Sequence, residues 1–110
     1  MLESEFDELS EKLFSKIEDL VDKLNLDIES NRAGNVLTLE TESGDQIVIN
    51  RHTPTAEVWL ASRAGGSRFF YENGKWLSSK DRETPFWSAL SQALSYVTEK
   101  PVSISENLIA

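Results

Sequence analysis

The chain has 110 residues, a formal net charge of −8 and no cysteine. The lack of cysteine excludes disulfides, thiolate metal sites and a cysteine nucleophile. The acidity argues against a nucleic-acid ligand, because phosphate binding needs clustered Lys and Arg. No apolar run reaches the roughly 20 residues that span a bilayer, and the N-terminus lacks the features of a signal or transit peptide. We expect a single domain, residues 1–110, in a bacterial cytoplasm, with no membrane partner.

Negative charge is concentrated near the N-terminus. Residues 1–30 hold ten acids and three lysines, a net charge of −7, whereas residues 31–110 hold nine acids and eight basic residues, a net charge of −1. Cations or a basic protein surface are the expected partners of such a patch.

The order of the predicted elements indicates the fold class. Apolar residues at spacings of three and four predict a helix over about residues 4–24. Short apolar runs predict strands at residues 26–30, 36–40, 46–50, 58–62, 68–71 and 75–77, with turns that include Asn31–Gly34 and Ala64–Gly66. A second helix is predicted from Pro85, with Thr84 as its N-cap, and it stops before Pro101. This order, in which one helix precedes five or six strands and a second helix follows them, predicts an α+β two-layer sandwich. Both helices are expected on one face of an antiparallel sheet.

The first predicted helix has an acidic flank. At about 100° per residue, four carboxylates fall at roughly 100° to 160° from Phe6, beside the apolar stripe: Asp7, Glu11, Glu18 and Asp22. Like charges one turn apart repel by a few tenths of a kcal/mol, so a compensating ligand is expected. Carboxylate oxygens suit iron, manganese, magnesium and calcium. A basic protein is a second interpretation, and a flank that serves only solubility is a third.

Several motifs resemble the frataxin family, in particular its bacterial CyaY-type members. They are Asn50 to Ser62 with Val58-Trp59-Leu60 at its centre, Gly65-Gly66, Gly74-Lys75-Trp76, Phe86-Trp87 and the opening Ser4-Glu5-Phe6. The resemblance covers nearly the whole chain and implies the frataxin fold. It also implies that the tail, residues 101–110, packs along the helices. Three positions depart from the common family pattern: His52, Arg68 and Asp7. Asp7 replaces a frequent His, and this change favours harder cations.

The resemblance implies two binding surfaces. The first, called the acidic ridge here, would bind iron weakly, or other divalent cations, and dock on a basic surface of the cysteine desulfurase; it comprises Glu3, Asp7, Glu11, Glu18, Asp19 and Asp22. Asp27 and Glu29 on the first strand would add to the partner contact. The second, called the Trp surface here, would face the scaffold protein on which the cluster is built; it comprises Asn50, His52, Trp59 and Arg68.

The leading function hypothesis is an iron-binding accessory or regulatory protein of iron–sulfur cluster assembly, which is not an enzyme. It would be a monomer that metal could drive into oligomers. One alternative is an iron-storage or iron-oxidising protein, which would need stronger ligand cages. Another is an acidic interaction module with no metal role. Without the resemblance, Trp59 would be interpreted as an ordinary core residue.

Overall fold

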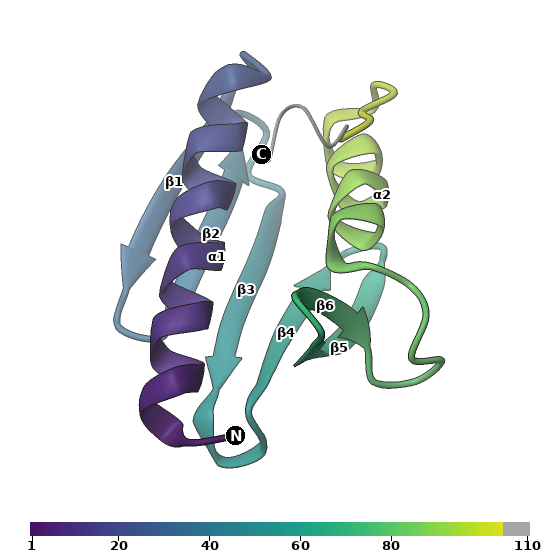
Figure 1. Ribbon diagram of the computed structural model, residues 1–110. Coiled ribbons are helices and arrows are strands. Elements are labelled where there is room, and N and C mark those ends of the chain that lie inside the picture. Colours follow the sequence, from purple (N-terminus) through teal and green to yellow (C-terminus); the bar gives the residue numbers. More distant parts are fainter. Residues whose placement is uncertain (105–110) are drawn as a thin grey trace.

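The computed structural model describes residues 1–104. Two helices flank a run of six strands (Figure 1), and a 3₁₀ turn, Thr53–Thr55, lies between the third and fourth strands. The helices are α1 (Glu3–Lys23) and α2 (Phe86–Thr98). The strands are β1 (Ile28–Ala33), β2 (Val36–Thr41), β3 (Gln46–His52), β4 (Glu57–Ser62), β5 (Gly65–Glu72) and β6 (Lys75–Ser78).

The strands form one antiparallel sheet in the order β1-β2-β3-β4-β5-β6, so each strand pairs with its neighbours in sequence. Short turns make this meander because antiparallel strands can be joined by a few residues. Asn73 and Gly74 both have positive φ in the β5–β6 turn, 50° and 81°, as a type I′ hairpin requires. Both helices cover the same face of the sheet (Figure 1). The predicted α+β two-layer sandwich is therefore confirmed.

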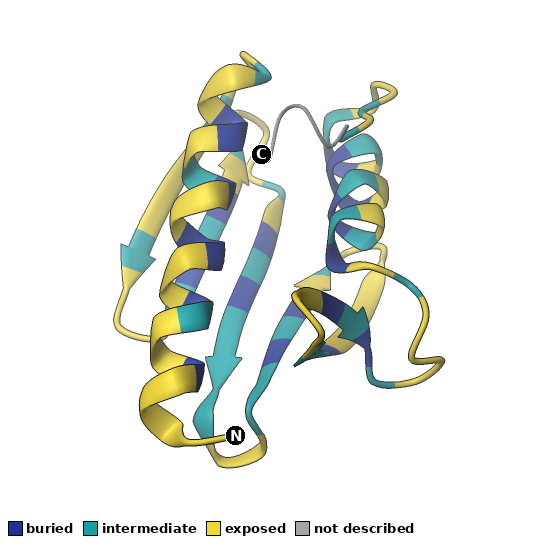
Figure 2. Ribbon diagram, viewed as in Figure 1, coloured by how far each residue is buried: buried dark blue, intermediate teal, exposed yellow. Residues whose placement is uncertain are grey.

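The core lies between the helices and the covered face of the sheet. Alternate residues of the strands point into it, including Leu37, Leu39, Ile47 and Ile49, and the buried stripe of α1 includes Phe6, Phe14 and Ile17. In Figure 2 the buried residues of both helices line the sides that face the sheet. Because side chains alternate along a strand, the residues between these core positions lie on the opposite, uncovered face of the sheet.

Two predicted turns are displaced along the chain, because the structure turns at residues 34–35 and 63–64. Asn31–Gly34 was expected to end the first strand, but β1 continues to Ala33 and places Arg32 directly opposite the core residue Leu37. Likewise Gly65 and Gly66 do not form a turn, because they begin β5 and pair with Ser62 and Ala61. In both cases pairing with a neighbouring strand outweighs weak intrinsic strand preference.

The start of α2 also differs from the prediction. Pro85, not Thr84, is the N-cap residue. Thr84 instead belongs to a tight loop closed by Asp81, whose carboxylate accepts hydrogen bonds from the backbone N–H groups of Glu83 and Thr84 at 2.9 Å. The Thr84 hydroxyl and these N–H groups lower the pKa of Asp81 to about 2.

The described part of the C-terminal tail packs along α2. The N–H of Val102 donates to Ser95 Oγ at 2.9 Å, and that of Ile104 donates to Ser91 Oγ at 3.2 Å. Both apolar side chains pack against the core. The remaining tail, for which packing along the helices was also expected, lies outside the described residues.

Candidate functional site

The centre of the acidic ridge is occupied by an arginine. Arg32 reaches from β1 to α1, where its Nη1 donates to both carboxylate oxygens of Glu11 at 2.5 Å. Its Nη2 donates to Glu18 Oε1 at 2.7 Å. One guanidinium thus bridges the carboxylates of two residues whose backbone positions are about 10 Å apart along the helix axis. Hydrogen bonds between two ionised groups are stronger than those between neutral groups, and the planar guanidinium can serve two carboxylates at once.

A second arginine supports this arrangement from β3. Arg51 Nη2 lies 3.6 Å from Glu11 Oε2, and Nη1 donates to the backbone oxygen of Asp7 at 3.4 Å. The guanidinium carbons of Arg32 and Arg51 lie 5.4 Å and 5.2 Å from the ring centroid of Phe14, which is fully buried. Their aliphatic stems and cation–π contacts fix this side of α1 to the sheet.

These contacts shift the pKa values of Glu11 and Arg32. The hydrogen bond from Arg32 lowers the pKa of Glu11 despite the opposing effect of desolvation, and the charges of Arg32 and Arg51 lower it further. The hydrogen bond to Glu11 in turn raises the pKa of Arg32. The Glu11 side chain is still 50% exposed, so solvent screening weakens the pair. Glu11 is therefore an ionised but largely neutralised member of the acidic ridge.

The ends of the acidic ridge differ from its centre. Glu3, Asp7, Asp19 and Asp22 are exposed, and within residues 1–104 none of their carboxylates forms an ion pair or hydrogen bond. In the same part of the chain, no three His, Cys, Asp or Glu side chains are arranged to enclose a metal ion. The ridge residues therefore fit loose binding of a cation by one or two carboxylates, and they do not fit a chelating cage.

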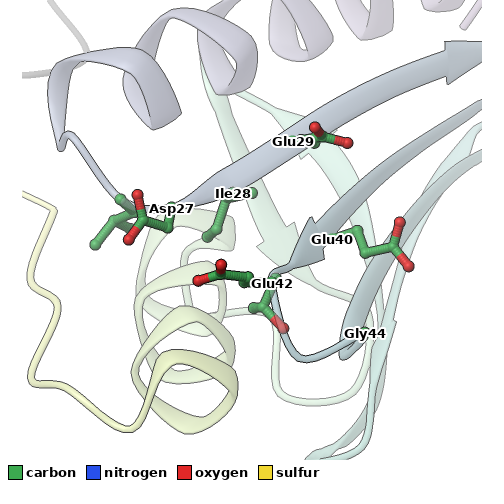
Figure 3. Close-up of a pocket in the computed structure, with 8 residues that line it drawn as sticks. Asp27, Ile28, Glu29, Glu40, Glu42 and Gly44 are labelled. Carbon is green, nitrogen blue, oxygen red and sulfur yellow. The ribbon is translucent and has the colours of Figure 1, made fainter.

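Asp27 and Glu29 extend the acidic surface beyond α1. They line an open hollow where β1 begins and β2 ends, together with Glu40 and Glu42 (Figure 3). Glu29 and Glu40 lie directly opposite each other in the β1–β2 register. Two like charges in that position destabilise the strand pair. Together with the neighbouring acids they make this edge of the sheet strongly anionic. Glu40 of β2 and Glu42 of the β2–β3 turn were not singled out from the sequence, because only the strand pairing places them beside β1.

The Trp surface is a stack built on three adjacent strands. The half-buried ring of Trp59 on β4 lies parallel to that of His52 on β3, with centroids 4.5 Å apart and an interplanar angle of 21°. Arg68 on β5 places its guanidinium carbon 4.6 Å from the Trp59 ring centroid. His52 is held by a hydrogen bond of 2.8 Å between Nδ1 and Thr55 Oγ1. The structure thus brings together three of the predicted residues on the uncovered face of the sheet.

Asn50 and Glu57 border this stack. Asn50 lies directly opposite Trp59 in the β3–β4 register. Glu57, which the sequence did not single out, accepts a hydrogen bond of 2.6 Å from Ser79 Oγ. Burial opposes ionisation of Glu57, but donors that include the Ser79 hydroxyl lower its pKa overall. The buried Nε1–H of Trp59 has no hydrogen bond of full geometry within residues 1–104, but it contributes to the lowered pKa of the Glu57 carboxyl, so it faces that carboxylate.

The arginines of the ridge were missed by sequence reasoning. Arg32 was assigned to a turn, and it pairs with residues 21 and 14 positions away. Arg51 was noted only as part of a motif. A usable signal was nevertheless present, because a strand that places a basic side chain on the face covered by an acidic helix needs a charge partner there.

The fold and the two surfaces define a small α+β protein with an acidic helix and an aromatic–cation stack on its open sheet. Neither helix in the described residues is long and apolar enough to cross a membrane. The family model described as the Frataxin-like domain matches residues 1–100. The chain belongs to this family.

Curated relatives and solved structures agree with this assignment. The chain is similar to the "Iron-sulfur cluster assembly protein CyaY" of Neisseria meningitidis, with 46% identity over 96% of this chain and 98% of the relative. The protein of the same name from Paraburkholderia phymatum is 37% identical over 96% of this chain and 99% of the relative.

Two solved structures show the same fold. Frataxin from Psychromonas ingrahamii superposes with a TM-score of 0.86 and 34% identity over 96% of this chain and all of that one. Trimeric yeast frataxin, complexed with ferrous iron according to its description, has a TM-score of 0.64 and 28% identity over 87% of each chain. The resemblance inferred from the sequence is confirmed.

Proposed function

We propose that this protein is an accessory factor of iron–sulfur cluster assembly that binds iron weakly at the acidic ridge and docks on the assembly machinery through two surfaces. The ridge, extended by Asp27 and Glu29, contacts a basic surface of the cysteine desulfurase. The Trp surface contacts the scaffold protein. The chain acts as one domain and as a regulator, without a catalytic residue of its own. The observation that carries the proposal is the unneutralised carboxylate surface at the ends of α1 on a member of this family.

Electrostatics support the ridge as a docking surface. The exposed acids at the C-terminal end of α1 are followed in the chain by those of Asp27 and β1, so a basic partner meets charge from both elements. Complementary charge of this kind increases the association rate and favours the correct partner. Weak iron binding is consistent with paired carboxylates that lack a third ligand within the described residues. Iron is therefore treated as a transient ligand or cargo and not as a resident cofactor.

The Trp surface supplies the specific contact in this proposal. Trp and Arg are the residues most enriched among energetically dominant interface positions. His52 and Arg68 hold the indole of Trp59 from either side and limit its motion. A pre-organised aromatic group loses little conformational entropy on binding. The open sheet face leaves room for a partner because both helices lie on the other side (Figure 1).

The proposal is tested by titrating ferrous iron, ferric iron and a basic cysteine desulfurase separately while recording backbone amide spectra. We expect the iron-induced changes to be confined to residues 3–29 and to weaken when Asp7, Asp19 and Asp22 are replaced with Asn. The desulfurase should perturb the same residues. The scaffold protein should instead perturb β3, β4 and β5.

Two other results would point elsewhere. Iron-dependent assembly into large particles would favour a storage or oxidising protein, an alternative that the trimeric yeast structure keeps open. Desulfurase binding without any response to iron would favour an acidic interaction module. Changes that spread evenly over the chain would refute the proposed ridge.

A further inference from the structure

Arg32 divides the acidic ridge into separate anionic groups. On a helix, carboxylates one turn apart can share a cation, which gives the pairs Asp7/Glu11 and Glu18/Asp22. Arg32 binds Glu11 from the first pair and Glu18 from the second. A single internal cation thus removes one carboxylate from each of the two pairs at the centre of the ridge.

This arginine is built into the fold and is not a mobile surface group. Its position on β1 is set by pairing with Leu37, and its guanidinium lies over the buried ring of Phe14. Only 24% of its side chain is exposed. The raised pKa of Arg32 is consistent with a permanent positive charge at this place. A cation that approaches the centre of the ridge must compete with an ion pair already formed.

We propose that Arg32 is a specificity-determining residue, an intramolecular counter-ion that excludes divalent cations from the centre of the acidic ridge and directs them to its ends. The inference rests on the proposed use of the ridge to bind cations. It assigns the binding to the carboxylates outside the reach of Arg32, namely Glu3 and Asp7 at one end and Asp19 and Asp22 at the other.

The two ends are not equivalent. The C-terminal end of a helix carries partial negative charge, so cations are favoured near Asp19 and Asp22 and disfavoured near Glu3. Arg51 also lies 3.6 Å from Glu11, but it has no contact with Glu18. Loss of the Arg32 charge would therefore release Glu18 completely and Glu11 only in part. The new binding should appear mainly at the Glu18/Asp22 pair.

The test uses the full chain, Mn²⁺ alone as the probe, and paramagnetic broadening of backbone amide signals. In the wild type we expect broadening centred on residues 19–22. In Arg32→Gln it should extend to residues 15–18, with apparent affinity about five-fold tighter, the factor expected from release of a surface ion pair. Arg32→Lys, which keeps the charge but cannot bridge two carboxylates as a fork does, should give an intermediate result. It also preserves a test if Arg32→Gln folds poorly.

Arg63→Gln is the matched control. It removes the same charge and breaks a comparable ion pair, with Asp45 at 2.8 Å, at a site on the β4–β5 turn. It should leave the Mn²⁺ pattern on α1 unchanged. If wild-type broadening is already centred on residues 11–18, or if Arg32→Gln binds like the wild type, the inference fails while cation binding by the ridge stands. If neither protein binds Mn²⁺ on α1, cation binding itself is refuted.

Discussion

An arginine takes part in each of the two candidate surfaces, and the two arginines act in different ways. On α1, Arg32 pairs with Glu11 and Glu18 and cancels part of the charge that makes the helix conspicuous. On the open sheet, Arg68 lies over Trp59 and adds charge and contact area to an aromatic group. The net negative charge of the acidic ridge is therefore smaller at its centre than the sequence suggests. The Trp surface offers a histidine ring and a guanidinium in addition to the indole of Trp59.

The difference follows from what lies on each side of the sheet. On the covered face a basic side chain is confined between helix and strand, so it must find a carboxylate or remain unpaired at high cost. On the open face water screens the charge, and an arginine can stack on an aromatic ring while its N–H groups remain available. Charge counts along a sequence do not separate these two situations.

The largest expected effect is on the free energy of unfolding, and it concerns Phe14, whose ring lies beneath the guanidinium groups of Arg32 and Arg51. Replacing Phe14 with Ala should cost about 3–5 kcal/mol of unfolding free energy, because it empties a fully buried site and removes the platform under Arg32 and Arg51. Urea unfolding followed by circular dichroism measures this cost. Trp59→Ala, on the open face, should cost about 1 kcal/mol or less. Equal costs for the two variants would contradict the contrast between the surfaces.

The second effect is on binding. Trp59→Ala should weaken the affinity for the scaffold protein by about 30-fold, the loss typical of a central interface aromatic residue. Isothermal titration calorimetry measures the dissociation constant. Tyr96→Ala is a control, because Tyr96 is an exposed aromatic residue outside the Trp surface and the guanidinium carbon of Arg63 lies 5.1 Å from its ring centroid. A similar loss in both variants would indicate a general effect of aromatic truncation rather than a specific contact.

The third effect is the pH dependence of the contribution that the Glu11–Arg32 ion pair makes to the free energy of unfolding. The pKa of Glu11 is lowered in the folded state from an ordinary value of 4.5, so its ion pair stabilises the protein above that pH and is lost as the pH falls through the folded-state pKa. At pH 7, Arg32→Gln should cost roughly 0.5–1 kcal/mol, since the pair is partly screened by solvent. Unfolding curves at pH 7 and pH 3 should show this cost shrinking on acidification. A constant cost would exclude the ion pair as its source.

The smallest effect concerns the loop before α2. The pKa of Asp81 is lowered from 3.8 to about 2, so its contribution to stability is present above pH 3.8 and is lost as the pH falls toward 2. Asp81→Asn should therefore melt slightly below the wild type at pH 7, and the gap should narrow as the pH falls through about 2. Thermal melts followed by circular dichroism give the comparison. A difference that is as large at low pH as at pH 7 would show that the loop depends on shape and not on charge.

The sequence predicted the architecture well because local patterns determine it. The spacing of apolar residues marks α1 and α2, and alternation marks the core strands that contain Leu37, Leu39 and Ile49. Trp59 was correctly expected on a partly exposed sheet position once the family resemblance was considered. These features depend on residues that are near one another in the chain.

The missed features depend on long-range contacts. Strand β1 is polar over Glu29 to Arg32, so its end is set by pairing with β2 and not by its own preference. That single misplacement hid the Arg32 contacts with α1. The stacking of His52 and Arg68 on Trp59 likewise required knowledge of the sheet register. Charged partners across elements were therefore the least predictable part of the site.

The affinity for a basic cysteine desulfurase tests the role of the unpaired carboxylates most directly, in two double variants that remove the same charge. Asp19→Asn with Asp22→Asn neutralises the open end of the ridge, and Glu11→Gln with Glu18→Gln neutralises its paired centre. We predict that the first double variant weakens binding by about ten-fold in a calorimetric titration at physiological salt, and that the second weakens it by about two-fold or less. Equal losses, or a larger loss at the centre, would contradict the claim that the unpaired carboxylates carry the interaction.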